Sequence, residues 1–366
     1  MIEAGRAILI AVGVGLGVLG AGTPAPEARP ALQRIEVSEP RMGTLARVVL
    51  YAASESEGKA AARAALDRVA ALDARLSDYR DDSEVAALSR AAAGVPITAS
   101  DDLIALLQAS EDLARRTGGV FDVTAGRLTH LWRRARRVNV LPAAADVEVA
   151  RAAGGHRHLR VDAARHTVTL MQPGIELDFG GIAKGYAADE ALRAVRARGI
   201  GAALVALGGD IAAGDPPPGR ATWSVAVPRL AASAEASAAK VADRSTTAAT
   251  EPYWIGLAHA AVSTSGDAEQ WMTAGGVRYS HVLDLRTGWP LTGRRSTTVV
   301  ARRGMDADAL STAIGILDDA AGAALLRSMR ERPSALWQHV TADGAVAAHQ
   351  TPNWPALGGP APVVTP

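Results

Sequence analysis

The chain has 366 residues, of which 48% are hydrophobic, so it is long enough to bury a sizeable core. Its formal net charge is +1 and its basic residues do not gather into a long stripe, which argues against a nucleic-acid partner. The absence of cysteine excludes thiolate catalysis, cysteine-ligated zinc, iron–sulfur clusters and disulfides at once.

The N-terminal segment has the pattern of a signal peptide. Residues 7–22 form an uncharged apolar run that follows Arg6 and precedes the Pro-rich stretch TPAPEARP. The run is shorter than the roughly 20 residues that a membrane-spanning helix needs. We therefore expect residues 1–30 to be a leader and linker, and the protein to be periplasmic or otherwise extracytoplasmic. An uncleaved leader would anchor it to the inner membrane, but lipid cannot be attached at Gly22, where a lipoprotein signal carries cysteine.

The next part of the chain alternates between strand and helix patterns. Residues 41–52 have the β-rich character of a strand, and residues 57–77 have helical apolar spacing. Ser100 is a predicted N-cap, and the helix that it starts is expected to end at Gly118 and Gly119. These signals predict a strand followed by two well-marked helices.

The main local concentration of positive charge is RLTHLWRRARR, residues 127–137. Its spacing favours a solvated helix face with Leu131 and Trp132 turned inward. The alternative is a site for an anionic partner.

Short elements follow up to the C-terminus. Residues 158–181 are predicted to form a strand, a turn at 163–165 and further strands. A helix over 187–198 and a strand over 202–214 follow. The segments AVSTSGD, RYSHVLDL and STTVVA are predicted strands, and residues 306–328 form a closing helical region. Residues 230–250 form a low-complexity Ala/Ser insertion, and residues 356–366 form a tail. Antiparallel hairpins with segregated helices predict an α+β fold for one domain over residues 31–355.

The segment DFGGIAKG, residues 178–185, has the features of an anion-binding loop. Its double glycine allows close backbone approach, and the helix behind it would present its N-terminal amides to a phosphate. Lys184 adds a cation beside that helix. The same Gly-Gly pattern also occurs in ordinary strand-to-helix turns, and the segment is neither a Walker loop nor a Rossmann fingerprint.

The segment DADALST, residues 306–312, places Asp308 and Thr312 four residues apart and so on one face of a helix. Both side chains offer oxygen, the ligand that magnesium favours together with phosphate and water. The alternative is that such residues cap the first turn of the helix. Asp306 and Ser311 lie beside them and are weaker candidates.

These two segments occur in one order with GGVFDVTAG at residues 118–126 and SHVLDLRTG at residues 280–288. Together the four resemble the ApbE-type FAD:protein FMN transferases, and the match to the family's D-x-G-G-I-A-K-G is close. The Gly-Gly-acid turn at 208–210 and STSGD at 263–267 resemble two further motifs of that family. The resemblance covers roughly residues 40–330.

The resemblance implies a T-fold-like α+β architecture, with mixed but largely antiparallel sheets, and an enzyme that uses Mg²⁺ and takes FAD as its substrate. It implies that the backbone carbonyl of Gly181 and the side chains of Asp308 and Thr312 hold the metal. The implied contacts to FAD are Met42, Tyr79, Val120, Phe121, Asp122, Asp178, Lys184, His281 and Val282. Tyr79 could stack on a ring of the dinucleotide.

The catalytic residues that the resemblance implies are His281, as general base, and Asp308. The alternatives for His281 are a histidine that orders its loop through hydrogen bonds, or one that contacts the flavin in the ground state. Leu285 stands where the family usually has proline, which affects the rigidity of this loop rather than the ligand-bearing groups.

The implied reaction transfers FMN from FAD to a threonine hydroxyl of a partner flavoprotein and releases AMP. One alternative is an FAD pyrophosphatase, in which water replaces the threonine. Another is an FAD-binding protein without turnover, against which the intact Asp308, Thr312 and Lys184 argue.

Overall fold

The computed structural model describes three ranges of the chain: 31–231, 251–266 and 270–355. The predicted leader over residues 1–30, residues 232–250 of the Ala/Ser insertion and the tail over 356–366 lie outside the described residues. No helix in the described ranges combines the length and the hydropathy that a membrane crossing requires.

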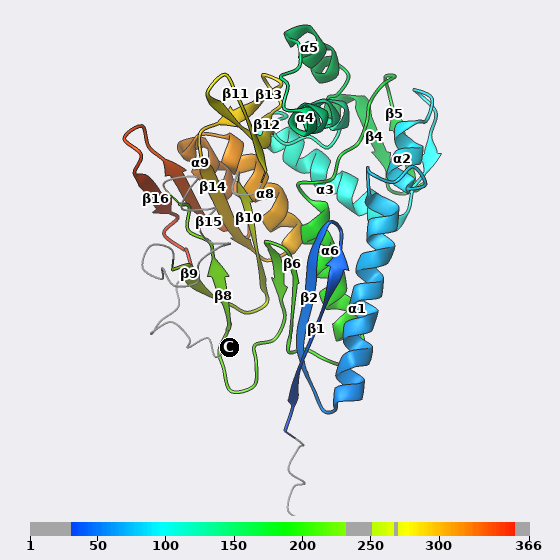
Figure 1. The fold of residues 1–366 in the computed structure, drawn as a ribbon. Coiled ribbons are helices and arrows are strands. Elements are labelled where there is room, and N and C mark those ends of the chain that lie inside the picture. The colour runs from blue at the N-terminus through cyan, green and yellow to red at the C-terminus, as the bar shows by residue number, and fades with distance from the viewer. Residues whose placement is uncertain (1–30, 232–250, 267–269, 356–366) are drawn as a thin grey trace, which may run out of the picture. The chain divides into compact units, whose positions relative to one another are not determined.

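An eight-stranded antiparallel sheet is the centre of the fold (Figure 1). Three neighbouring pairs, β1–β2, β6–β7 and β15–β16, are hairpins, and longer connections join the other neighbours. In spatial order its strands are β1 (Gln33–Arg41), β2 (Thr44–Ala52), β6 (Ala203–Leu207), β7 (Asp210–Ala213), β10 (Ala260–Gly266), β14 (Arg295–Ala301), β15 (Ser334–Val340) and β16 (Val346–Gln350).

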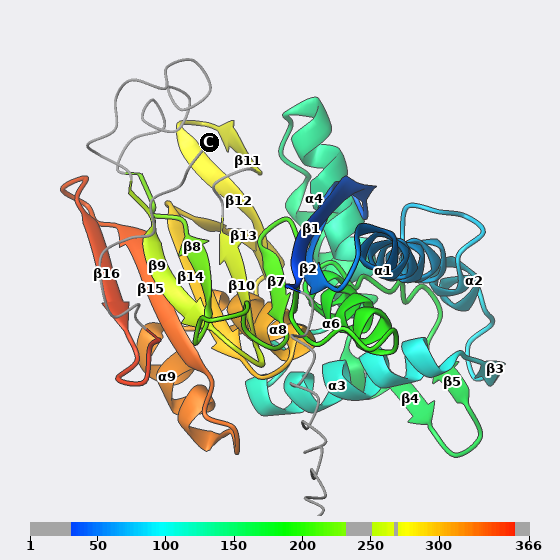
Figure 2. The ribbon, with the colours of Figure 1, turned by 90° about the horizontal axis from the view of Figure 1, so that it is seen from below.

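Both faces of this sheet are covered, because its strands are apolar on both sides. In β2, Val48 and Leu50 belong to the main core, whereas Val49 belongs to a second cluster on the opposite face. The main core includes α1 (Glu55–Leu76), α6 (Ala183–Arg196) and α8 (Gly304–Ile316), and the second cluster is closed by the hairpin of β8 (Trp223–Val227) and β9 (Tyr253–Leu257). Figure 2 shows the helices on one side of the sheet and this hairpin on the other.

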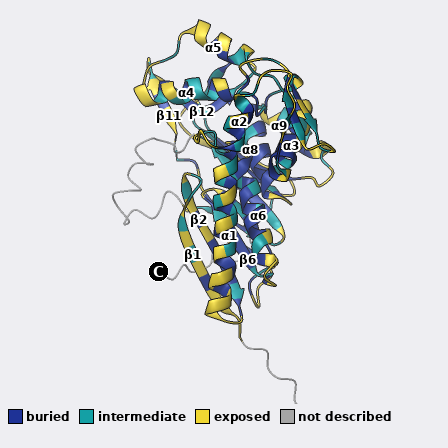
Figure 3. Ribbon diagram, turned by 90° about the vertical axis from the view of Figure 1, so that its right-hand side faces the viewer, coloured by how far each residue is buried: buried dark blue, intermediate teal, exposed yellow. Residues whose placement is uncertain are grey.

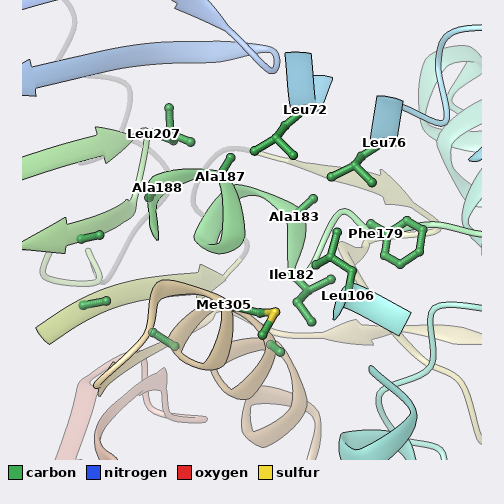
Figure 4. Close-up of a cluster of buried hydrophobic side chains, with 14 of the residues drawn as sticks. Leu72, Leu76, Leu106, Phe179, Ile182, Ala183, Ala187, Ala188, Leu207 and Met305 are labelled. Atoms are coloured by element: carbon green, nitrogen blue, oxygen red, sulfur yellow. The ribbon is translucent and has the colours of Figure 1, made fainter. Parts of the chain in front are cut away.

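Small side chains let the helices of the main core approach closely. Figure 4 shows Ala183, Ala187 and Ala188 of α6 between the leucines of α1 and Met305 of α8. The faces of α6 and α8 in this layer are buried, while the outer face of α1 is exposed (Figure 3). The core is thus built from Ala, Val and Leu, as the low aromatic content of 4% requires.

The remaining elements surround one end of this layer. They are α2 (Glu84–Ser89), β3 (Ile97–Thr98), α3 (Asp101–Thr117), α4 (Gly126–Val138), α5 (Ala144–Ala152), a 3-10 turn (His156–His158), β4 (Leu159–Asp162), β5 (Thr167–Leu170), β11 (Trp271–Ala274), β12 (Val277–Asp284), β13 (Trp289–Thr292) and α9 (Asp319–Ser328). β11, β12 and β13 form one small sheet, and β3, β5 and β4 form another.

The predicted α+β class is confirmed, and so is the helix between Ser100 and the paired glycines. Ser100 Oγ accepts from Leu103 N at 3.3 Å, and Gly118 ends α3 with φ +62°. The strand predicted over residues 41–52 is shorter, because Met42 and Gly43 form a tight turn with φ +49° and +70°.

Three other expectations about the elements were wrong. The helix predicted to begin at residue 187 begins at Ala183, immediately behind the double glycine. The segment Gly174–Asp178, expected to be a strand, forms only a single bridge, between Glu176 and Ala125. The helical region expected to close the chain is followed by β15 and β16.

Candidate active site

Two glycines bring the DFGGIAKG and DADALST segments together. A Cβ on Gly185 of α6 would lie 2.1 Å from the carbonyl oxygen of Gly304 at the start of α8, and a Cβ on Gly304 would lie 2.4 Å from that of Gly185. Any larger residue at either position would overlap the facing backbone. The close crossing of α6 and α8 therefore depends on both glycines.

Each of these helices caps the N-terminus of the other. Asp308 Oδ2 of α8 accepts from Gly185 N at 3.0 Å. Asp189 of α6 accepts from Gly304 N at 2.7 Å and from Met305 N at 3.0 Å. The carboxylates satisfy amides that would otherwise lack partners and interact favourably with the helix dipoles.

This arrangement corrects two expectations. Asp308 lies beyond the first turn of its own helix, whose N-cap is Arg303, so it does not cap that helix. The N-terminus of α6 was expected to face a phosphate, but its amide at Gly185 is bound to Asp308 and its amide at Ala183 is bound to Phe179 O.

The carboxyl group of Asp308 is fully enclosed. Burial, together with the negative charge of nearby Asp210, raises its pKa to about 7, and Lys184 and the amide of Gly185 offset this only in part. A carboxyl group in this state has a strong electrostatic reason to take a cation as its next neighbour.

The Gly-Gly-acid turn supplies the partner of Lys184. Asp210 begins β7 directly after Gly208 and Gly209, and its carboxylate forms an ion pair with Lys184 Nζ. The other oxygen of Asp210 accepts from Ser263 Oγ at 2.5 Å. Asp210 and Ser263 are each 2% exposed, so this contact lies within the protein interior.

A chain of hydroxyl groups continues from there to Thr312. Ser263 Oγ lies 3.3 Å from Ser311 Oγ, which lies 2.9 Å from Ser265 Oγ. Ser265 Oγ in turn lies 2.9 Å from Thr312 Oγ1. The STSGD motif therefore fixes the position of Thr312 through hydrogen bonds, although it supplies none of the predicted metal ligands.

The DFGG loop lies against the same threonine. A Cβ on Gly181 would lie 3.1 Å from Thr312 Oγ1 and 3.4 Å from Cε2 of Phe121. Gly181, Asp308 and Thr312, the predicted metal ligands, thus come from two segments that the α6–α8 crossing holds together.

The donor set of these three residues suits magnesium. A carboxylate, a hydroxyl and a backbone carbonyl are all hard oxygen ligands, and they leave room for phosphate oxygens and water. Among the described residues, no group of three or more His, Cys, Asp or Glu side chains is arranged to hold a metal. The mixed set of Gly181, Asp308 and Thr312 would instead combine one carboxylate with a hydroxyl and a carbonyl oxygen.

The GGVFDVTAG segment runs beside the DFGG loop, since Asp178 N donates to Val123 O at 2.8 Å. Val120 and Phe121 are buried in apolar clusters. The carboxylate of Asp122 accepts from Thr124 N at 2.9 Å and from His156 N at 2.6 Å, and thus orders this loop.

His281 and Val282 lie on β12, a strand that packs near α8. Val282 packs with Val120 and with Ile316 at the end of α8. His281 N donates to Gln270 O at 3.1 Å and thereby ties β12 to the start of β11. The strand that carries His281 therefore borders both the 118–126 loop and α8.

Met42 lies in the turn between β1 and β2, and Tyr79 lies in the loop that follows α1. Met42 lines a pocket of about 620 Å³ between the β1–β2 turn, the end of α1 and Arg80. Thr44, which also lines this pocket, lies against the Gly-Gly-acid turn, because a Cβ on Gly208 would lie 2.7 Å from Thr44 Oγ1. Tyr79, which precedes the pocket-lining Arg80, is 74% exposed.

Several residues of the site were missed by sequence reasoning. Ser263 and Asp210 lay inside motifs that were noticed, but nothing in the sequence indicated that they face one another. Arg133 was treated as part of a solvated helix face, yet its side chain is 19% exposed and donates to Asp178 at 2.8 Å. Its position next to Trp132 was the sequence signal for a half-buried side chain, because the residue after an inward-facing tryptophan often flanks the buried face.

The sequence and the fold are similar to those of known proteins. The model of the ApbE family matches residues 42–337. A protein named FAD:protein FMN transferase from Treponema pallidum (strain Nichols) is 33% identical over 335 residues, which cover 87% of each chain. The crystal structure of Pseudomonas stutzeri flavinyl transferase ApbE, apo form, is similar with a TM-score of 0.72 and 27% identity, covering 88% of this chain and 96% of that one. The flavin transferase ApbE from Vibrio cholerae has a TM-score of 0.73 and 25% identity, covering 88% and 98%.

Proposed function

The chain belongs to the ApbE family, and we propose that it is a magnesium-dependent enzyme that transfers FMN from FAD to a threonine of a partner flavoprotein. The family membership and the names of its relatives support flavin transfer as the activity. The metal and the threonine acceptor are inferences from the oxygen donors of the site and from the chemistry that they allow.

In the proposed step, a threonine Oγ of the acceptor attacks the FMN-side phosphorus of FAD. The bond between this phosphorus and the bridging oxygen of the pyrophosphate breaks, and the oxygen leaves with its electron pair as part of AMP. The threonine proton passes to His281, which acts as general base. The products are a phosphoester-linked FMN and AMP.

Gly181, Asp308 and Thr312 would hold magnesium, which when bound offsets the charge of the pyrophosphate and of the leaving AMP. Lys184, in the first turn of α6, adds a positive charge that is held in place by its ion pair with Asp210. The hydroxyl chain through Ser263 and Ser265 keeps Thr312 oriented toward Gly181. These residues therefore form a preorganised electrostatic environment for phosphoryl transfer.

One observation carries the proposal. A Cβ on Gly181 would lie only 3.1 Å from Thr312 Oγ1, and Asp308 lies one helical turn from Thr312 with a pKa raised to about 7. The buried carboxyl group is hard to explain by stability alone, because burial of a carboxyl group costs free energy. Both features suit a bound cation and a phosphate.

The test measures AMP release from FAD and Mg²⁺ with and without a candidate FMN-acceptor domain. A transferase releases AMP only when the acceptor is present and its threonine is intact. AMP formed at the same rate without an acceptor would identify an FAD pyrophosphatase instead. FAD binding with no AMP under either condition would identify a flavin-binding protein without turnover.

We also propose that the protein acts outside the cytoplasm. The apolar run over residues 7–22 and the Pro-rich stretch behind it support export, and an uncleaved run would leave the protein attached to the inner membrane. Fractionation of the native host tests this proposal, since recovery of the full-length chain only from the cytosol would contradict it.

A further inference from the structure

Arg133 of α4 makes three contacts with residues on the Asp178 side of the site. Its Nη2 donates to Asp178 Oδ2 at 2.8 Å, and its Nη1 donates to Asp78 Oδ2. Its Cζ lies 4.6 Å from the centre of the Tyr79 ring. The side chains of Asp78 and Asp178 are only 11% and 9% exposed, so water screens these ion pairs less than it screens surface pairs.

Arginine is the side chain that can make all three contacts at once. Its planar guanidinium group donates from separate nitrogens, while its face remains free to lie on an aromatic ring. Through these contacts Arg133 joins two loops that are far apart in the sequence. One loop follows α1 and carries Asp78 and Tyr79, and the other is the DFGG loop that begins at Asp178.

His130, one turn earlier on α4, joins the same regions a second time. Its Nε2 lies 3.0 Å from Asp78 Oδ2, and its Nδ1 lies 2.6 Å from Glu176 Oε2. Burial raises the pKa of Asp78, but hydrogen bonds from His130 and the charge of Arg133 outweigh it, so the net pKa lies below the ordinary value. Asp78 therefore remains an anion that both side chains of α4 can hold.

Tyr79 depends on this arrangement because the core does not hold its ring. The residue is 74% exposed, and its backbone N donates to Ser77 Oγ at 3.2 Å. Arg133 covers one face of the ring, which leaves the other face for a planar group. Without Arg133 the ring would keep more rotamer freedom, and a ligand would have to pay that entropy on binding.

We infer that Arg133 is a positioning residue for FAD, which holds Tyr79 and Asp178 in one arrangement before the dinucleotide binds. The inference rests on the proposed function, because it takes these two residues as FAD contacts. Arg133 has no contact with Asp308 or Thr312 in the structure. Its role therefore affects the affinity for FAD rather than the rate of the bound complex.

The test titrates FAD into the wild-type protein and three variants, and then measures KM and kcat for AMP release with an acceptor domain. Arg133→Lys keeps the charge but loses the planar fork. Tyr79→Leu removes the ring but keeps the ion pairs, and Arg134→Ala, at the exposed neighbouring position, is the matched control. Thermal unfolding of each variant shows whether it is folded.

Arg133→Lys and Tyr79→Leu are expected to weaken FAD binding roughly tenfold or more, the effect of losing one hydrogen bond to a charged group or one stacked ring. KM should rise in parallel, kcat should stay within about threefold, and Arg134→Ala should match the wild type. A double variant should lose less than the product of the two single losses, because the ring and the guanidinium act together.

Wild-type FAD affinity in a folded Arg133→Lys protein would overturn the inference. If the lysine variant did not fold, wild-type FAD affinity in Tyr79→Leu would overturn it. A fall in kcat as large as the rise in KM would also overturn it, because Arg133 would then act on the reaction itself. Failure of the wild-type protein to bind FAD would overturn the proposed function, and that result is distinct from the other two.

Discussion

At the scale of single residues, the carboxyl group of Asp308 has two roles. It accepts from the amide of Gly185 at 3.0 Å, and it is the predicted carboxylate ligand of the metal. Asp308→Asn keeps the shape and an acceptor for that amide, but it removes the negative charge. We expect AMP release to fall by about 10²-fold or more, since a metal contributes several kcal/mol to the transition state.

Asp306→Asn is the control for this change, because Asp306 lies two residues earlier on the same helix and is paired with Arg303 at 2.7 Å near the surface. It should stay within a few-fold of the wild-type rate. Equal rates for Asp308→Asn and the wild type, measured with both proteins folded, would remove Asp308 from the proposed metal site.

His281 is tested separately from the metal. If it is the general base, His281→Asn should slow attachment of FMN by about 10²- to 10⁴-fold while FAD affinity changes little. The measurement is single-turnover attachment at saturating FAD, monitored by the mass of the acceptor. A wild-type rate would leave His281 the role of ordering β12 or of contacting the flavin.

The hydrogen bonds of His130 predict that the stability of the protein depends on pH. The hydrogen bond to Asp78 is the main cause that raises its pKa, with a smaller contribution from Glu176. Since the pKa is higher in the folded state, the stabilisation is complete below the ordinary value of about 6.5 and is lost as pH rises through the folded-state pKa.

The wild-type protein should therefore have a larger free energy of unfolding than His130→Gln. This difference should be larger at pH 6 than at pH 9. The side chain is 37% exposed, so solvent screening limits the effect to about 1 kcal/mol or less. Urea unfolding of both proteins at the two pH values measures it, and an advantage that grows toward pH 9 would contradict the assigned charge state.

At the scale of elements, the crossing of α6 and α8 decides the geometry of the site. Gly185→Ala would place a methyl group 2.1 Å from the carbonyl oxygen of Gly304, so we expect a loss of about 1–3 kcal/mol or more of stability. Gly209→Ala is the matched control, because a Cβ there would meet its nearest atom at 3.7 Å. Thermal unfolding compares the two, and equal melting temperatures would contradict the close crossing.

The elements that were predictable are those with local signals. Ser100 and Gly118 mark the two ends of α3 by capping chemistry, and the i,i+4 spacing of Asp308 and Thr312 placed both correctly on one helix. The sequence pattern did not predict β1 and β16. Each is an edge strand with many exposed residues, and in such strands apolar and polar residues alternate only weakly.

At the scale of the whole molecule, the site is assembled from segments that the sequence keeps apart. The order of the motifs predicted which segments belong to one family, and the family match over residues 42–337 confirms it. The contacts between motifs were not predictable, because they depend on which hydroxyl groups of β10 face α8 and which side of α4 faces the loops. The hydroxyl chain to Thr312 and the contacts of Arg133 arise from that packing.

The activity that we propose is covalent attachment of FMN to a threonine of another protein. The most direct measurement is the intact mass of an FMN-acceptor domain after incubation with the protein, FAD and Mg²⁺. We expect a mass gain equal to one FMN less one water, with AMP released in equal amount, and no gain when the acceptor threonine is replaced by alanine or when Mg²⁺ is chelated. An unchanged acceptor mass, with FAD consumed to free FMN and AMP, would contradict it.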